Sequence, residues 1–232
     1  MENLQAEMVA PFGPVIYKVK FEDRYIDEML DKIDEARTTE NLDASQYLVG
    51  RIKEQYEISS IVSEDCTGHL YNHCANYWWN YTGQNAPDNS LYLESLWVNI
   101  QRPYEFNPVH QHGGAFSFII YLKNTISYED VVDNEYDKNQ HQKIAGQVEF
   151  LYGEYNFMNA DTFRHNPQQG DILIFPAWLK HTAYPFYKEN EERLSVAGNF
   201  YFNLGGQNVD THDPNFNSGD IKYTENFTYE TK

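Results

Sequence analysis

The sequence lacks the features that would place the protein in a membrane or outside the cell. Its 232 residues include no apolar run of roughly 18 residues, so no transmembrane helix is expected. No basic region precedes an apolar stretch at the N-terminus, as a secretory signal would require. The only two cysteines, Cys66 and Cys74, match no four-ligand zinc pattern, and we assign them no role. We therefore expect a soluble, cytoplasmic protein with no membrane partner.

Positive charge is also scarce. The chain has 17 Lys and Arg residues against 35 Asp and Glu residues, which gives a formal net charge of −18. Nonspecific binding to nucleic acids or to anionic membranes depends on clustered Lys and Arg side chains that neutralise phosphates. We therefore expect neither kind of partner. Acidic clusters such as 129–137 and 189–192 are typical of solvated loops.

The length predicts one domain, because single-domain β-barrels and sandwiches often have about 200–250 residues. Residues 1–90 are expected to form a helical support. Within them, Gly13 to Phe21 alternates apolar and polar residues as a half-buried strand does. Glu22 to Ala36 and His69 to Tyr81 carry apolar residues at helical spacing and are predicted to be helices.

Residues 91–203 are expected to form a β-barrel core, because their apolar segments are short and separated by Pro, Gly and Asn clusters. The predicted strands are Tyr92 to Gln101, Ala115 to Leu122, Gln147 to Tyr152, Asp171 to Phe175 and Arg193 to Asn203. Residues 204–232 are acidic and rich in Asn, and we expect a tail of loop structure. The predicted fold class is thus mainly β with N-terminal helices.

His110 and His112 form the only His-x-His pattern in the chain. Residues two apart in a strand project from the same face, so both imidazoles could reach one metal ion. Taken alone, the pattern is equally compatible with two histidines that fell close together by chance. A third histidine, His181, follows the strand Asp171 to Phe175, and Arg193 opens the next strand twelve residues later.

This combination resembles the iron- and 2-oxoglutarate-dependent dioxygenases. In those enzymes a histidine motif opens one strand, a distal histidine follows another, and an Arg-x-Ser opens the strand after that. The segments GQVEFLYGEY, GDILIFPAWLKH and ERLSVAGN also resemble small members of that superfamily encoded by marine phages and bacteria. The resemblance covers roughly Leu91 to Asn203. It implies a double-stranded β-helix, a jelly-roll or cupin-like barrel, with Fe(II) in its mouth and with 2-oxoglutarate and O₂ as cosubstrates.

The resemblance also assigns roles to individual residues. Fe(II) needs three protein ligands that leave positions open for 2-oxoglutarate and O₂, and these would be His110, His112 and His181. The far carboxylate of 2-oxoglutarate needs a fixed cation with paired donors and a hydroxyl beside it, which Arg193 and Ser195 could supply. Tyr121 stands where prolyl-hydroxylase-like relatives place a tyrosine on the same carboxylate, although a core tyrosine is an equally good interpretation.

The histidine motif departs from the pattern of the superfamily, in which Asp or Glu usually stands at the position of His112. Two interpretations follow. Three histidines could hold the metal, which leaves the centre one charge more positive than in relatives. Alternatively His112 could be the first ligand, the carboxylate would be missing, and the site would resemble that of halogenating relatives. We favour three histidines, because His110 otherwise has no role.

Three classes of function therefore remain open at this point. The first is a hydroxylase that uses 2-oxoglutarate. The second is a three-histidine dioxygenase that does not use it, and the third is an inactive binding barrel. The substrate, a small molecule or a protein side chain, is not specified by the sequence. We expect the insertion 124–145 to overhang the pocket, and the remaining histidines, His141, His165 and His212, to lie on the surface.

Overall fold

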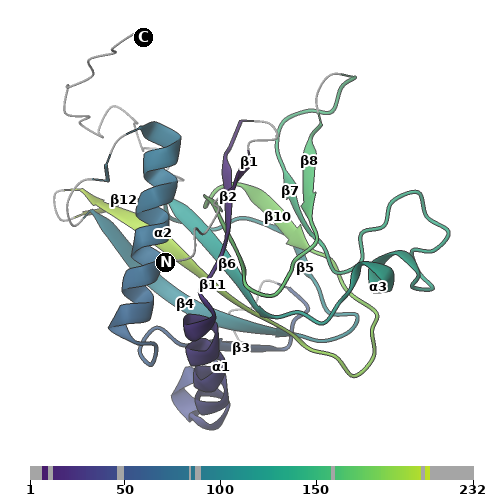
Figure 1. Cartoon of the computed structure of the whole chain (residues 1–232), viewed down its shortest axis with the longest axis horizontal. Coiled ribbons are helices and arrows are strands. Elements are labelled where there is room, and N and C mark those ends of the chain that lie inside the picture. Colours follow the sequence, from purple (N-terminus) through teal and green to yellow (C-terminus); the bar gives the residue numbers. More distant parts are fainter. Residues whose placement is uncertain are drawn as a thin grey trace.

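The structure is a computed structural model that describes residues 7–9, 13–45, 50–83, 85–86, 90–157, 160–204 and 207–209. Its elements follow in chain order: β1 (Glu7–Val9), β2 (Ile16–Lys20), α1 (Asp23–Thr38), η1 (Glu40–Leu42), β3 (Glu54–Glu57), α2 (Glu64–Thr82), β4 (Leu91–Gln101), β5 (Asn107–His110), β6 (Phe116–Lys123), α3 (Tyr128–Val132), β7 (Val148–Leu151), β8 (Thr162–His165), β9 (Asp171–Pro176), β10 (Lys180–Ala183), β11 (Arg193–Leu204) and β12 (Gln207–Val209). Figure 1 shows their arrangement.

The strands form two antiparallel sheets. The larger sheet has the order β1-β2-β9-β6-β11-β4-β3, with β12 added beside β11, and the smaller has the order β5-β10-β7-β8. The sheets face each other, because buried apolar side chains of β6 and β9 pack against those of β7 in one cluster. This arrangement is the jelly-roll barrel expected from the sequence, and the predicted mainly-β fold class is confirmed.

The two faces of the larger sheet have different neighbours. Leu96, Val98 and Ile100 of β4 are fully buried in the cluster that also contains the apolar sides of α1 and α2. The residues between them, Trp97 and Asn99, face the space between the sheets, where the cavity lies. The two-residue period of β4 therefore separates a helix-covered face from a face available for a site.

The N-terminal region provides more than helices. Strand β2 pairs with β9 and strand β3 pairs with β4, so this region also extends both edges of the larger sheet. Helix α1 matches its predicted range closely, but α2 begins five residues before the predicted His69. The earlier start follows from the N-cap, because the Ser63 hydroxyl accepts a hydrogen bond from the backbone N–H of Cys66 at 3.1 Å. Both cysteines are buried and free.

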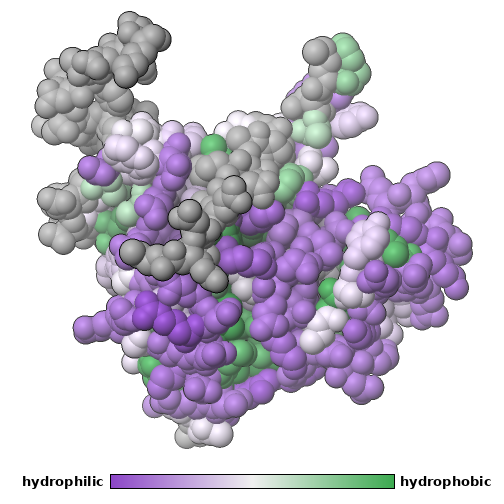
Figure 2. Space-filling model, viewed as in Figure 1, coloured by the Kyte–Doolittle hydropathy of each residue, from purple (hydrophilic) through white to green (hydrophobic). Residues whose placement is uncertain are grey.

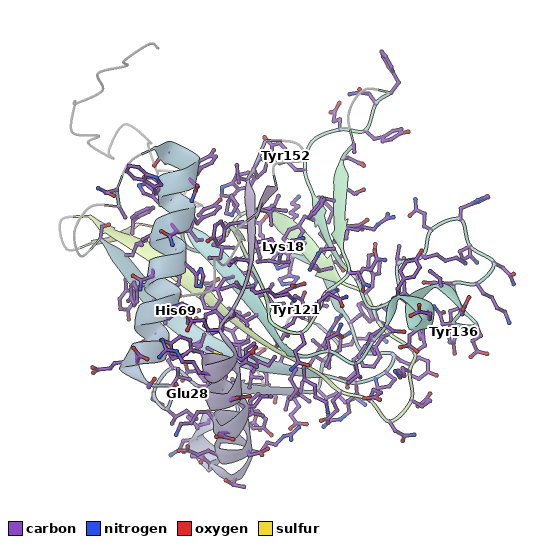
Figure 3. All side chains as sticks on the ribbon, viewed as in Figure 1. Lys18, Glu28, His69, Tyr121, Tyr136 and Tyr152 are labelled. Carbon is purple, nitrogen blue, oxygen red and sulfur yellow. The ribbon has the colours of Figure 1, made fainter. Side chains whose placement is uncertain are left out.

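The insertion 124–145 carries the short helix α3 and packs against the segment that contains Phe186 and Lys188. Ile126 and Val131 are buried against Phe186, and Lys188 forms an ion pair of 3.1 Å with Asp130. In Figure 3 the labelled Tyr136 of this insertion lies far from His69 of α2, at the opposite edge of the molecule. The insertion is therefore held at the outer end of the barrel.

The tail after residue 204 is partly structured, because Gln207–Val209 form β12 and pair with β11. The expectation of a tail without regular structure is wrong for these residues. His212 lies outside the described residues. No helix in the described part of the chain is long and apolar enough to span a membrane. The face seen in Figure 2 is largely hydrophilic, as the net charge of −18 leads one to expect.

Candidate active site

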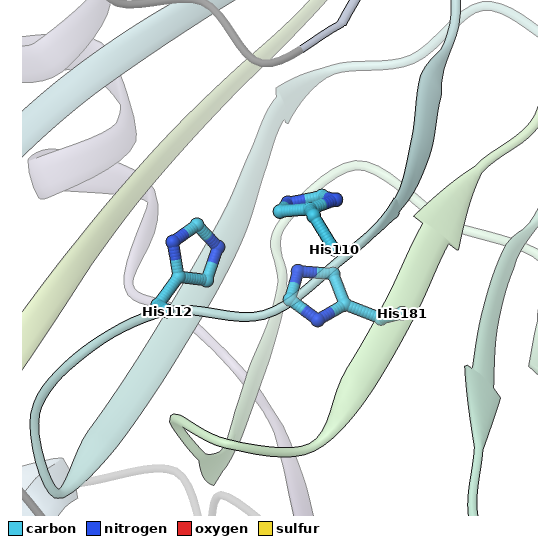
Figure 4. A group of neighbouring side chains, drawn as sticks. All are labelled: His110, His112 and His181. Atoms are coloured by element: carbon cyan, nitrogen blue, oxygen red, sulfur yellow. The ribbon is translucent and has the colours of Figure 1, made fainter. Parts of the chain in front are cut away.

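The three predicted histidines meet at one point between the sheets. The ring centroids of His110 and His181 lie 4.3 Å apart, and His112 lies 4.9 Å from His110 and 5.2 Å from His181. Each ring offers one nitrogen, and these three nitrogens all lie within 4.8 Å of one another. Figure 4 shows the rings converging on a shared space. This is a spacing that one transition-metal ion could bridge.

The backbone brings the rings together in a way that differs from the prediction. His110 is the last residue of β5 rather than part of an opening strand, and His112 lies in the link to β6. A backbone hydrogen bond of 3.0 Å from the N–H of His112 to the carbonyl of Ala177 holds that link. His181 follows the end of β9, as predicted, but it lies within a further strand, β10, and pairs directly with His110 in the antiparallel register. Neighbouring strands, rather than one strand face, therefore bring His110 and His181 together.

Hydrogen bonds fix the orientation of two of the rings. The Nδ1 of His110 lies 2.8 Å from the carbonyl oxygen of Pro108, and the Nδ1 of His181 lies 2.9 Å from that of Leu179. A carbonyl oxygen can only accept, so Nδ1 carries the proton in both rings and Nε2 keeps its lone pair. Metal-binding histidines are usually oriented in this way by a bond from the other ring nitrogen. The same anchoring at His110 and His181 indicates that His110 belongs to the site.

Burial keeps the imidazoles neutral. Desolvation lowers the pKa of His110, and it lowers the pKa of His112 to about 4, with a smaller contribution from His110. The pKa of His181 lies well below the usual value for the same reason, since its ring is almost completely buried. Neutral imidazoles have the free lone pair that a metal ligand needs.

A cavity of about 630 Å³ adjoins the three histidines. Its wall on the larger sheet includes Trp97, Asn99 and Ala197, and its outer rim includes Asp43 and Glu57. The volume suits a small molecule or a single side chain of a larger substrate. No residue of the insertion 124–145 lines the cavity, so the expectation that this insertion overhangs it is wrong.

A row of polar side chains crosses the larger sheet beside the cavity. Asn99, Ser195 and Tyr121 stand opposite one another on β4, β11 and β6. All three are at least nine-tenths buried. Of the three, Asn99 lines the cavity, so the row adjoins a space that a polar ligand could occupy.

Arg193 lies at the next level of the sheet, beyond this polar row. Its guanidinium donates from Nε to the Oε1 of Gln101 at 3.1 Å, from Nη2 to the same oxygen, and from Nη1 to the carbonyl oxygen of Gly146. No acidic side chain of the described residues forms an ion pair with it. Burial lowers its pKa, while Tyr121 opposes that effect, and an arginine nevertheless stays charged in proteins. Two of its five N–H groups remain available.

Asn99 and Gln101 are the site residues that the sequence analysis did not identify. Gln101 accepts hydrogen bonds from the guanidinium of Arg193 but, as a neutral amide, does not neutralise its charge. Asn99 lines the cavity. The alternation of Tyr92 to Gln101 places Asn99 and Gln101 on the polar face of the strand. This alternation was the sequence feature that could have identified them. Their significance depends on the register between β4 and β11, which no local pattern contains.

The other histidines lie away from this centre. His165 is not a loose surface residue, because its Nε2 lies 2.8 Å from Asp171 Oδ2 and it belongs to β8. His141 is exposed, as expected. On α2, the Nε2 atoms of His69 and His73 lie 3.1 Å apart, and these two rings pack against Phe21.

Comparison with known proteins agrees with the fold. The sequence profile of the family "Putative 2OG-Fe(II) oxygenase" matches residues 95–199, which include all three histidines, Tyr121, Arg193 and Ser195. None of the curated proteins compared with the chain matches it. The family match and the three-histidine cluster support Fe(II), 2-oxoglutarate and O₂ as the cofactors.

Solved structures share the fold at low sequence identity. A viral collagen prolyl hydroxylase from Paramecium bursaria Chlorella virus-1, in a truncated form, is 12% identical, with a TM-score of 0.50 over 86% of this chain and 97% of that one. The non-heme alpha-ketoglutarate-dependent epimerase SnoN from nogalamycin biosynthesis is 15% identical, with a TM-score of 0.52 over 80% and 75% of the two chains. The carbocyclase SnoK from the same biosynthesis is 9% identical, with a TM-score of 0.53 over 81% and 79%. These likenesses confirm the double-stranded β-helix.

Proposed function

We propose that the protein is an Fe(II)- and 2-oxoglutarate-dependent dioxygenase that hydroxylates its substrate. The observation that carries this proposal is the convergence of three neutral imidazoles beside a cavity, two of them anchored through Nδ1. His110, His112 and His181 are the proposed ligands. Bound Fe(II) would supply the chemistry that activates O₂, and the three ligands leave positions for O₂ and the cosubstrate.

Arg193, Ser195 and Tyr121 are the proposed binding residues for the far carboxylate of 2-oxoglutarate. Arg193 keeps its full charge because its partners, Gln101 and the Gly146 carbonyl, are neutral. An anion held there gains a charge-assisted hydrogen bond in a site that excludes water. The hydroxyls of Ser195 and Tyr121 have no partner among the described residues, and each could donate one further hydrogen bond.

The three-histidine ligand set favours hydroxylation over halogenation. A halogenating site needs a ligand position that the protein leaves vacant, and that interpretation gives His110 no role. The Nδ1 of His110 is anchored on a carbonyl in the same way as that of His181, which supports a common role for the two rings.

Oxygen uptake tests the proposed function. The protein should be loaded with Fe(II) without oxygen and then exposed to O₂ with 2-oxoglutarate or with succinate. We expect O₂ consumption that requires both Fe(II) and 2-oxoglutarate. Uptake that requires Fe(II) alone would assign the protein to the dioxygenases that do not use 2-oxoglutarate. Metal binding without uptake under any condition would favour an inactive binding barrel.

A further inference from the structure

The cavity beside the histidines carries charge of one sign. Asp43 and Glu57 supply carboxylates to its outer wall, and no Lys or Arg stands among the described residues that line it. Asp43 follows η1, and hydrogen bonds from the Ser45 side chain and backbone lower the pKa of its carboxyl. Glu57 is the last residue of β3. Two carboxyl side chains therefore line this wall, and no basic side chain among the described lining residues offsets them.

Glu57 stands beside an aromatic face. The antiparallel register places it directly opposite Trp97, where neighbouring Cβ atoms lie about 5 Å apart. The indole ring of Trp97 lies 5.7 Å from the imidazole of His112, measured between centroids. One carboxylate oxygen of Glu57 accepts hydrogen bonds from Ser59, and the other, Oε2, has no partner among the described residues. Glu57 thus stands next to the indole of Trp97, and that indole stands next to the imidazole of His112.

The amide of Asn99 completes this wall. Asn99 is 7% exposed, lines the cavity and makes no side-chain hydrogen bond to a described residue. It stands next to Trp97 on the same face of β4, so a ligand held by the indole also comes within reach of its carboxamide oxygen. Asn99 therefore presents to the cavity an amide that no described residue uses as a side-chain hydrogen-bond partner.

The charged side chains near β4 stand at two levels of the strand, and Arg193 and Gln101 lie outside the lining of the cavity. Gln101 marks the level of Arg193, and Trp97 marks the level of Glu57, four residues along the strand. At about 3.4 Å per residue these levels are separated by about 14 Å. An anion is attracted to the Arg193 end and repelled from the Glu57 end, whereas a cation experiences the reverse. A carboxylate near Arg193 and a cation near Glu57 would therefore occupy different positions and would not compete.

We infer that the substrate is a cationic compound or side chain, whose protonated amine or guanidinium binds between Glu57, Asp43 and the face of Trp97. The inference rests on the proposed function, since it assigns the substrate to the cavity beside the proposed metal ligands. A cation over an indole gains a favourable contact with the ring face, and two carboxylates add charge-assisted hydrogen bonds. Binding at this wall places the carbons a few bonds from the nitrogen next to His112.

Binding of matched probes tests this inference. The probes are Nα-acetyl-lysine methylamide, its neutral counterpart Nα-acetyl-norleucine methylamide, and the anionic Nα-acetyl-glutamate methylamide. Dissociation constants are measured by calorimetry with protein that contains Mn(II) and 2-oxoglutarate, and again with metal-free protein. We expect the lysine compound to bind at least about tenfold more tightly than the norleucine compound, with a preference that shrinks at high salt. The glutamate compound should bind least.

Two double variants assign that preference to the wall. Asp43→Asn with Glu57→Gln should reduce it to less than about threefold. Asp27→Asn with Asp31→Asn removes the same charge from exposed positions of α1 and should leave it unchanged. Equal affinities for the lysine and norleucine compounds, no binding of the lysine compound, or an equal loss in both double variants would overturn the inference.

The same titrations separate this inference from the proposed function. A preference for the lysine compound in protein that does not bind 2-oxoglutarate would contradict the proposed function but support a cation site in the cavity. Binding of 2-oxoglutarate without any preference among the probes would overturn the cation site alone.

Discussion

Arg193 and Gln101 face each other on neighbouring strands, and the Oε1 of Gln101 accepts hydrogen bonds from both Nε and Nη2 of the guanidinium. The partner is a neutral amide, so the arginine remains available to an anion. Gln101→Glu would place a carboxylate of nearly the same size in that position. We expect it to weaken 2-oxoglutarate binding by at least about tenfold, because the new carboxylate competes for the same cation.

Calorimetry with 2-oxoglutarate in the presence of Mn(II) measures the effect of Gln101→Glu. Gln140→Glu is the control, since it makes the same change of charge at an exposed position of the insertion. Unchanged affinity in Gln101→Glu would show that Arg193 does not bind the cosubstrate.

Arg193 and Ser195 should differ in their contributions to cosubstrate binding. Removal of one partner of a buried charge-assisted pair typically costs about 2–5 kcal/mol, so Arg193→Met should weaken 2-oxoglutarate binding by at least about 30-fold. Ser195→Ala removes one hydroxyl and should cost about 0.5–2 kcal/mol, a few-fold to about 30-fold. Arg193→Met also leaves Gln101 Oε1 and the Gly146 carbonyl without their donor, so its unfolding should be measured without ligand. A larger loss from Ser195→Ala than from Arg193→Met would contradict the assignment.

The three histidines should contribute comparably to metal binding. We expect each of His110→Ala, His112→Ala and His181→Ala to lose most of the Fe(II) that the wild type retains, since each removes one of three ligands. Metal analysis after gel filtration measures this, and Mn(II), Co(II) or Ni(II) can replace Fe(II). His141→Ala, at an exposed position, is the control. Retention of metal by His110→Ala alone would revive the vacant-site interpretation and make halogenation the leading hypothesis.

Asp171 should make the stability of the barrel depend on pH. Burial alone would raise the pKa of its carboxyl, but hydrogen bonds from His165, Lys20 and the backbone N–H of Gln168 lower it from 3.8 to about 2. A carboxyl whose pKa is lower in the folded state stabilises the fold above its unfolded pKa, and this contribution is lost as pH falls. The contribution is about 2 kcal/mol at neutral pH.

Urea unfolding of the wild type and of Asp171→Asn at several pH values tests this dependence. Between about pH 4 and pH 2 the wild type should lose more free energy of unfolding than the variant, by about 2 kcal/mol. Asp31→Asn, at an exposed position of α1, should behave as the wild type does. Parallel pH curves for the wild type and Asp171→Asn would show that the Asp171 interactions contribute nothing.

The sequence predicts the long elements of this fold well, because their patterns are long. Strands β4 and β11 have 11 and 12 residues, so a two-residue period remains recognisable in them even where single residues depart from it. Strands β5 and β10 have four residues each, and strand β3 is only partly buried along its whole length, so none of them has a readable period. Short strands of this kind are specified by their neighbours in the sheet rather than by their own residues.

The candidate site shows the same division. His110, His112, His181 and Arg193 could be selected because their residue types are chemically distinctive and their spacing resembles a known family. The roles of Asn99 and Glu57 depend on which residues stand opposite them on other strands, and a single sequence does not contain that register.

The response of the folded protein to 2-oxoglutarate tests the central claim most directly. A ligand that binds only the folded state raises the melting temperature according to its concentration relative to Kd. With Mn(II) present to prevent turnover, 2-oxoglutarate should raise the melting temperature clearly. Succinate, which lacks the keto oxygen that chelates the metal, should raise it little. No shift with 2-oxoglutarate, or an equal shift in Arg193→Met, would contradict the proposed cosubstrate site and leave only the barrel fold established.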